Sequence, residues 1–408
     1  MIQKQLADAM PNDVVYYYVI KKQVCQIEPH ASGDIMETQA EDDEPKVLGS
    51  IHSSNMGPML GELRMSVVIT TYQAGRLVIL GQNDEGTLNT HYCEFRRPMG
   101  LAFRGDRMAI GVETEILEFH DLPAVARKMP PVGTYEAAYL PCRSHQTGDI
   151  QIHEMAWVSK YGSASELELL FVNTRFSCLC KRESPYSFVP VWRPNFVSAI
   201  APEDRCHLNG LAIRDNMPRY VTALGESDTR FGWRDKKKDG GILIDIQSNE
   251  VMTRGLSMPH SPRWYAGKLW VLNSGCGGFG TIDPATGRYQ EVTRLPGFTR
   301  GLDFVGPLAF IGLSQVRESA TFSGIEIADR PLEERACGLW VVDINTGQTV
   351  GYVKFNDALQ EIFAVSLVPR YRMDVIVDDQ NILSDSFVLP DQALQDVASL
   401  FRDNTASE

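Results

Sequence analysis

The sequence predicts an all-β fold made of a single β-propeller, and three observations carry this prediction. A short motif, in which a polar residue opens an apolar strand, recurs at intervals of about 40 to 60 residues. A second apolar run follows each copy after a short turn. Third runs end in an aspartate and a Gly- or Asn-containing turn, as at Asp245, Asp283 and Asp343. Repeated units of short strands at this spacing are typical of propeller blades.

The clearest copy of the motif is Cys206–Ala212, with the sequence CHLNGLA. Weaker copies are RPMGLAF at 97–103, IHEMAW at 152–157, PHSPRW at 259–264 and TRGLDF at 299–304. Aligned copies predict inner strands that start at Val68, Met99, His153, Asn209, His260, Arg300 and Glu361. Seven starts favour seven blades. Because the first unit is short and the last is irregular, six and eight are alternatives, and we expect strands near 365–377 to close the ring.

The segments outside the repeats define the predicted domain boundaries. Residues 1–46 form an N-terminal appendage that could also supply a closing strand, and residues 47–390 form the propeller. Leu394, Val397, Leu400 and Phe401 are spaced as on one face of a helix. We therefore expect residues 391–408 to form a C-terminal helix and tail.

Composition limits the partners and the location. The 408 residues are 43% hydrophobic and 22% charged, which is typical of a globular protein, and the formal net charge is −13. This charge argues against nonspecific binding to nucleic acid or to an anionic membrane. The start of the chain lacks an apolar core of signal-peptide length, and no apolar run is long enough to cross a bilayer. Eight scattered cysteines favour a reducing compartment, so we expect a cytoplasmic protein.

The aligned starts place an unusual set of polar side chains around the predicted axis. Alignment puts Met99, His153, Asn209, His260, Arg300 and Glu361 at one equivalent position. His207 comes two residues before Asn209, so a strand would point both side chains to the same face. Buried imidazoles and charged groups are unfavourable without partners. This ring therefore needs mutual hydrogen bonds, water, a metal or a ligand.

Histidines on neighbouring strands predict a transition-metal site. We expect His153, His207 and His260 to be ligands of Fe, Cu or Zn, with Asn209 beside them, because imidazole suits these metals. Glu361 and Arg300 would be catalytic, and Glu361 or Glu154 could orient a ligand or act as a base. The alternative is a water-filled axial channel whose polar residues bond to one another.

Loops after the second strands predict a polar funnel above this ring. They contribute Arg175, Arg230, Asn273, Arg317 and Glu226 as candidate substrate-binding residues. Arginines near an axis could hold a carboxylate or phosphate of a small polar molecule or a peptide. The alternative is that these loops are polar because they face water.

Several segments together resemble an uncharacterised bacterial family of conserved hypothetical β-propeller proteins. They are TYQAGRL at 71–77, HLNG at 207–210, SPRW at 261–264, LPGFTRGL at 295–302 and GLSQVRE at 312–318. The resemblance covers roughly residues 48–388 and implies the propeller fold, without established catalytic residues. Asn209-Gly210 is also similar to a cation-holding element of gluconolactonase-type propellers, but the histidine-rich ring departs from their oxygen-ligand site. Carotenoid-cleaving oxygenases offer an analogy of architecture alone.

Three functional hypotheses follow. The leading one is a metal-dependent enzyme acting on a small polar or anionic molecule or peptide at the axis, with redox or oxygen chemistry favoured because imidazoles suit transition metals. The second is a noncatalytic propeller whose loops bind a ligand, a peptide or a protein partner. The third is a lactonase or hydrolase with a divalent cation, which would use carboxylate ligands.

Overall fold

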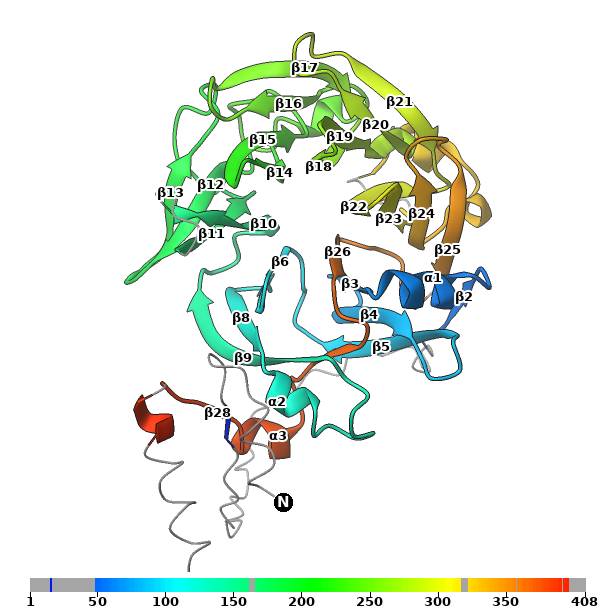
Figure 1. Ribbon diagram of the computed structural model, residues 1–408. Coiled ribbons are helices and arrows are strands. Elements are labelled where there is room, and N and C mark those ends of the chain that lie inside the picture. Colours follow the sequence, from blue (N-terminus) through cyan, green and yellow to red (C-terminus); the bar gives the residue numbers. More distant parts are fainter. Residues whose placement is uncertain are drawn as a thin grey trace, which may run out of the picture.

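A computed structural model describes residues 15–16, 48–160, 166–316, 322–356, 358–390 and 392–395. Six sheets surround a central axis, with one strand of each nearest to it (Figure 1). The propeller prediction is confirmed, and the number of blades is six, one of the two alternatives to seven. Except for 15–16, the predicted appendage at 1–46 lies outside the described residues, as does most of the predicted C-terminal helix.

Three blades are built of four strands that follow one another from the axis outward. The first is β10 (Ile152–Ser159), β11 (Leu167–Asn173), β12 (Cys178–Glu183) and β13 (Tyr186–Trp192). The next is β14 (Leu208–Arg214), β15 (Met217–Ala223), β16 (Gly241–Asp245) and β17 (Glu250–Leu256). The third is β18 (Pro259–Tyr265), β19 (Lys268–Asn273), β20 (Gly278–Ile282) and β21 (Tyr289–Arg294).

Two further blades have an added outer strand. One is β22 (Phe298–Val305), β23 (Leu308–Ser314), β24 (Gly338–Asp343), β25 (Thr349–Phe355) and β2 (Ser50–His52). The other is β6 (Leu101–Arg104), β7 (Arg107–Gly111), β8 (Glu115–Asp121), β9 (Ala137–Gln146) and β27 (Met373–Val375), where β27 runs parallel to β9.

The remaining blade explains why the predicted number was too high. Its strands are β26 (Ala364–Val368), β3 (Ser66–Thr71), β4 (Arg76–Gln82) and β5 (Leu88–Glu94), in that order. Val68 of β3 pairs with Ser366 of β26, so the starts assigned to Val68 and Glu361 belong to one blade. The innermost strand comes from the C-terminal part of the chain. This arrangement closes the ring within the predicted segment 365–377.

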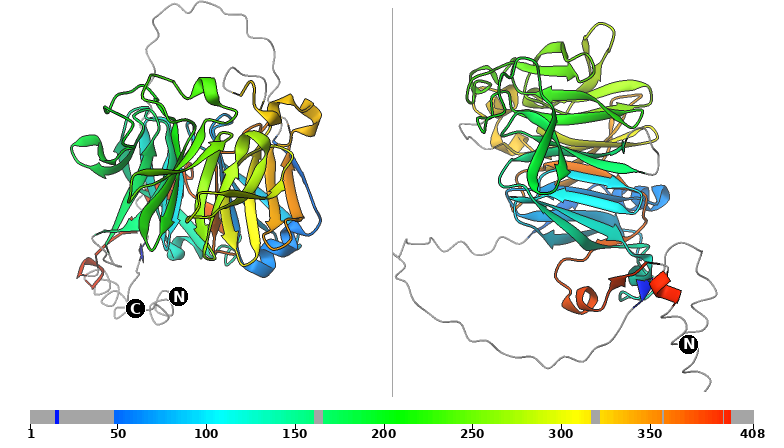
Figure 2. Two further views of the ribbon diagram at one scale, coloured as in Figure 1. Left: turned by 90° about the horizontal axis from the view of Figure 1, so that it is seen from above. Right: turned by 90° about the vertical axis from the view of Figure 1, so that its left-hand side faces the viewer.

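Short helices and turns lie outside the blades. They are α1 (Met56–Leu63), α2 (Pro123–Ala126), α3 (Gln380–Ser384), η3 (Arg234–Lys236), η4 (Ser274–Cys276), η5 (Glu326–Asp329) and η6 (Leu332–Glu334). β1 (Val15–Tyr16) pairs with β28 (Phe387–Val388), away from the ring (Figure 2). Among the described residues, no helix is both long enough and apolar enough to span a bilayer.

Apolar cores fill the spaces between neighbouring sheets, and polar side chains form hydrogen bonds from one blade to the next. The Thr70 hydroxyl donates to the Met99 carbonyl at 2.7 Å, and the Thr174 hydroxyl donates to the Leu208 carbonyl at 2.6 Å. The Asn209 amide donates to the Pro259 carbonyl at 3.0 Å. Each bond crosses from one blade to the next. These hydrogen bonds therefore hold neighbouring blades together.

Gly210 lies at a close approach between two blades, and we expect Gly210→Ala to destabilise the protein by about 1–3 kcal/mol because the added methyl group overpacks this contact. A Cβ at Gly210 would lie 2.2 Å from Cδ of Pro262 in the next blade and 2.4 Å from the Thr222 hydroxyl. In Gly81→Ala, the matched control, the nearest atom would be at 3.6 Å. Urea unfolding of both variants checks this. Equal stability of the two would contradict it.

Candidate functional site

Residues of five blades line an axial cavity. The aromatic ring of Phe363, which precedes β26, covers one wall. The polar lining includes His153, Glu154, Asn209, His260, Arg263 and Arg300. Four residues that the sequence placed at the ring position are thus together: His153, Asn209, His260 and Arg300.

His153 and His260 are held in the same way, and this fixes their tautomers. Nδ1 of His153 is 3.0 Å from the Gln151 carbonyl and 2.8 Å from the Thr174 hydroxyl. Nδ1 of His260 is 2.8 Å from the Met258 carbonyl and 3.1 Å from the Ser274 hydroxyl. Because a carbonyl oxygen only accepts, each Nδ1 carries the hydrogen. Each Nε2 therefore keeps its lone pair for another partner.

His207 is placed differently from the expectation. It precedes β14 with a left-handed backbone (φ 51°), so the two-residue alternation of a strand does not put it beside Asn209. It packs edge-on against His153, with 4.9 Å between ring centroids, and its Nδ1 donates to the Asp204 carboxylate at 2.9 Å. The Trp233 indole also donates to Asp204, at 3.0 Å. His207 thus adjoins the ring histidines without lining the cavity.

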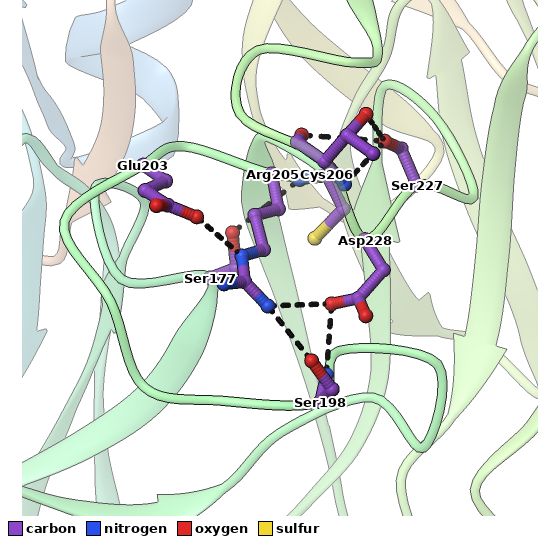
Figure 3. Close-up of polar contacts among 8 residues, drawn as sticks. Ser177, Ser198, Glu203, Arg205, Cys206, Ser227 and Asp228 are labelled. Carbon is purple, nitrogen blue, oxygen red and sulfur yellow. Dashed lines mark hydrogen bonds and ion pairs between the residues drawn. The ribbon is translucent and has the colours of Figure 1, made fainter.

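Arg205 anchors the segment that leads to His207 (Figure 3). Its guanidinium donates to Glu203 at 2.7 Å, to Asp228 at 2.7 Å and to the Ser198 hydroxyl at 3.0 Å. Asp228 also accepts from the backbone N–H of Ser198 at 2.8 Å. These bonds join the β13–β14 connection to the β15–β16 loop, so they fix the turn on which His207 sits.

Asn209 lines the cavity, but both ends of its side chain already have protein partners. Its amide donates to the Pro259 carbonyl, and its carbonyl accepts from the Thr222 hydroxyl at 2.6 Å. An amide held at both ends sets the spacing of neighbouring blades. Its role in this structure is to join blades.

Arg263 and Glu154 form an ion pair across the axis. The guanidinium donates to the two carboxylate oxygens at 3.0 and 3.1 Å, and Glu154 is 7% exposed. Arg263 also donates to the Leu302 carbonyl at 2.9 Å and to the Leu211 carbonyl at 3.4 Å. Burial raises the pKa of Glu154, and the charge of Arg263 opposes that rise. This arginine therefore connects four blades, and each of its three nitrogens donates a hydrogen bond.

Arg300 is a second arginine inside the ring, and its surroundings differ from those of the hydrogen-bonded Arg263. It is 8% exposed, lines the cavity, and within the described part of the chain its guanidinium makes no hydrogen bond or ion pair. Its Cζ lies 3.6 Å from the centroid of the Phe363 ring. Burial lowers the pKa of Arg300 to about 10, so it is cationic at neutral pH. A cation without a hydrogen-bonded partner faces the cavity.

Metal-ligand geometry is met elsewhere among the described residues. The three axial histidines do not bring their ligand atoms within 4.8 Å of one another, whereas His91, Cys93 and Asp374 do. The axial metal site is not formed in this arrangement of side chains, and it stays a prediction.

A family described as "Domain of unknown function (DUF4915)" matches residues 54–377. The chain belongs to this family. The resemblance to an uncharacterised family is thereby confirmed. No curated protein matches the chain.

Three solved structures are similar to this DUF4915 chain. A nidogen/laminin complex is 8% identical over 75% of this chain and 99% of its own, with a TM-score of 0.45. A protein of unknown function from Bacteroides caccae has the same identity and coverages and a TM-score of 0.47. The computationally designed Ika8 protein is 13% identical over 71% of this chain and 74% of its own, with a TM-score of 0.32. None of them supports an inference about what this chain binds.

The other predicted residues of this DUF4915 chain lie outside the cavity. Met99 belongs to an apolar core between two blades. Glu361 precedes β26 by three residues and accepts a hydrogen bond from Tyr72, while Phe363 and Ala364 take the lining position in that blade.

The predicted loop residues have partners of their own. Arg175 is exposed and donates to the Asp149 carbonyl, and Arg230 stacks over Phe231. Glu226 pairs with Arg254, and Asn273 accepts from the Ser257 N–H. Arg317 lies outside the described residues.

Sequence reasoning gave no role to the residues that orient the histidines. Thr174 and Ser274 each follow the asparagine that ends a second strand, Asn173 and Asn273. The Asn-Thr and Asn-Ser pairs occupy equivalent places in the repeat and could have indicated this role. The hydroxyl of each pair bonds to the histidine of its own blade. Arg263 was visible as the arginine of the SPRW segment.

We expect acid to destabilise this protein partly through its buried histidines. Burial holds the pKa of His260 well below its usual value, and the nearby Arg300 charge adds to this effect. The unfolded chain therefore binds more protons as the pH falls through about 6.5, and stability falls by about 1 kcal/mol between pH 6.5 and 5.5. Urea unfolding at both values should show a smaller loss in His260→Gln. The same loss in both proteins would contradict the prediction.

Proposed function

We propose that the axial cavity binds a small molecule carrying a carboxylate or another anionic group, with Arg300 as its anchor. The observation that supports this proposal is the contrast between two neighbouring arginines. All three nitrogens of Arg263 donate to Glu154 or to backbone carbonyls, whereas Arg300 faces the cavity with no such partner among the described residues. A guanidinium out of water is favourable only when an acceptor completes its hydrogen bonds.

The two histidines indicate a second feature of the ligand. His153 and His260 are both held neutral by burial, which lowers their pKa values, and no described residue donates a hydrogen bond to Nε2 of either ring. An acceptor beside a guanidinium suits a ligand that combines an anion with a hydroxyl or ammonium donor. The ligand class is therefore a small hydroxy- or amino-carboxylate.

Ligand titration tests the proposal. The unfolding temperature and the heat of binding are measured with acetate, lactate, glycine, serine, succinate, phosphate and sulfate. We expect one or more carboxylates to bind the wild-type protein and to bind Arg300→Met at least about 30-fold more weakly, as loss of a buried charged partner does. Exposed Arg175→Met is the control and should bind normally. Failure of every anion to bind, or equal binding by Arg300→Met, would overturn the proposal.

A metal-dependent enzyme at the same axis is the second candidate, and one observation favours it. His153, His207 and His260 all donate Nδ1–H to fixed oxygen acceptors, which is how metal-ligating histidines are usually oriented. A ligand set for Fe, Cu or Zn would need side-chain movement, and the charge of Arg300 opposes a cation there. For these reasons we place it second. Lactonase chemistry ranks below it because Glu154 is occupied by Arg263.

Elemental analysis of protein purified without chelators tests the second candidate. If this candidate holds, the wild-type protein contains more iron, copper or zinc per chain than the double variant His153→Ala and His260→Ala. Metal content that is unchanged in this double variant would exclude the axis as its site.

We also propose that the protein acts in the cytoplasm. The seven described cysteines are free, although Sγ of Cys178 and Cys180 lie only 3.4 Å apart. Thiols this close stay reduced most readily in a reducing compartment.

A further inference from the structure

We propose that His91, Cys93 and Asp374 form a zinc site at the outer edge of the ring, independent of the axial cavity. Each residue offers one ligand atom, and the three atoms lie within 4.8 Å of one another. Nε2 of His91 is 3.1 Å from Oδ1 of Asp374, and His91 also bonds to the Cys93 thiol. These are the nitrogen, sulfur and oxygen donors that zinc takes in proteins.

The fold brings the three residues together from two blades. His91 and Cys93 are two residues apart on β5, so their side chains share one face of the strand. Asp374 is the middle residue of β27, the outermost strand of the adjacent blade. Sγ of Cys93 contacts the Val375 carbonyl at 3.5 Å, which fixes the thiol against β27. The contact between the outer strands of two neighbouring blades, rather than a flexible loop, sets the geometry.

Distances, charge and access all suit zinc. Tetrahedral bonds of about 2.0–2.3 Å place ligand atoms about 3.3–3.6 Å apart, so shifts of about 1 Å or less would complete the set. A thiolate and a carboxylate would balance the charge of Zn²⁺. Cys93 is 4% exposed, whereas the His91 side chain is 47% exposed, which leaves an open side for entry and for a water as fourth ligand.

A metal here would cross-link two strands of neighbouring blades. It would tie β27, from the C-terminal part of the chain, to β5, the outer strand of the blade that closes the ring. Since the unfolded chain holds these residues far apart in sequence, metal binding stabilises the folded state. We therefore expect Zn²⁺ to raise the unfolding temperature of the chelator-treated protein.

Cobalt and zinc titrations of the full chain test the site. Chelator-treated protein is titrated with Co²⁺ under reducing conditions, and Zn²⁺ is then added to displace it. We expect one Co²⁺ per chain, a thiolate-to-cobalt charge-transfer band, and loss of that band with Zn²⁺. Cys93→Ser should lose the band, and His91→Gln and Asp374→Asn should bind at least about 10-fold more weakly, since even loss of an outer partner costs that much.

Two controls make the outcome decisive. Cys142→Ser removes an exposed thiol elsewhere and should bind as the wild type does. His153→Gln alters the axial cavity and should also leave the band unchanged, so failure of the zinc site and failure of the proposed axial function are separable. If Cys93→Ser does not fold, the cobalt titration of His91→Gln decides the test, because the His91 side chain is exposed and its replacement should not prevent folding. A wild-type protein that binds no Co²⁺ or Zn²⁺, or a band that survives these ligand changes, overturns the proposal.

Discussion

Replacing Arg263 with methionine is expected to lower the free energy of unfolding by about 3 kcal/mol, the low end for breaking a buried ion pair. The loss comes mainly from Glu154, which is 7% exposed and would keep a charge inside the ring without its bidentate partner. The carbonyls of Leu302 and Leu211 would also lose a donor. One substitution therefore loosens contacts among four of the six blades.

The control and the double variant separate charge from packing. Arg254 makes a similar pair with Glu226, but its side chain is 60% exposed, so Arg254→Met should cost about 1 kcal/mol or less. Adding Glu154→Gln to Arg263→Met should restore part of the lost stability, because it removes the uncompensated charge. The measurement is urea unfolding monitored by tryptophan fluorescence. If Arg263→Met and Arg254→Met lose equal stability, the pair does not hold the ring together.

Periodicity alone was sufficient to predict the propeller architecture and four of the residues that line the axial cavity. The motif around Asn209 repeats because each inner strand must pack against its neighbours in the same way, so alignment of its copies also placed His153, His260 and Arg300 at the cavity. The number of blades was harder to predict. In one blade, β26 pairs with β3, although the two strands are nearly 300 residues apart in the chain. Counting repeats along the sequence does not reveal this pairing.

Backbone conformation and loop position account for the other differences between the predicted and the observed site residues. His207 follows the same sequence spacing as a strand neighbour, but its left-handed backbone turns it toward Asp204 and Trp233. Arg175 and Arg230 have the residue type expected of anion binders, yet both are exposed and lie away from the cavity lining. Residue type therefore identified cavity-lining side chains only where the strand repeat also fixed their position.

Arg300→Met is expected to change stability in the opposite direction from Arg263→Met. It should make the ligand-free protein more stable by about 1–2 kcal/mol, because Arg300 is desolvated without hydrogen bonds from the described residues. The contact with Phe363 and the more distant charges of Glu361 and Glu154 offset only part of that cost. Methionine has a similar length and would keep the contact with the Phe363 ring.

The paired outcome identifies the function of the arginine. A structural arginine loses stability on replacement, whereas one kept for a ligand gains stability and loses binding, as active-site residues often do. Unfolding of wild type, Arg300→Met and Arg300→Lys is measured with and without a carboxylate that binds the wild type. The wild type should be stabilised by the ligand and Arg300→Met should not respond, while Arg300→Lys should retain weaker binding because it keeps the charge but not the planar guanidinium. A ligand-free Arg300→Met that is less stable than the wild type would assign Arg300 to the framework of the ring, alongside Arg263.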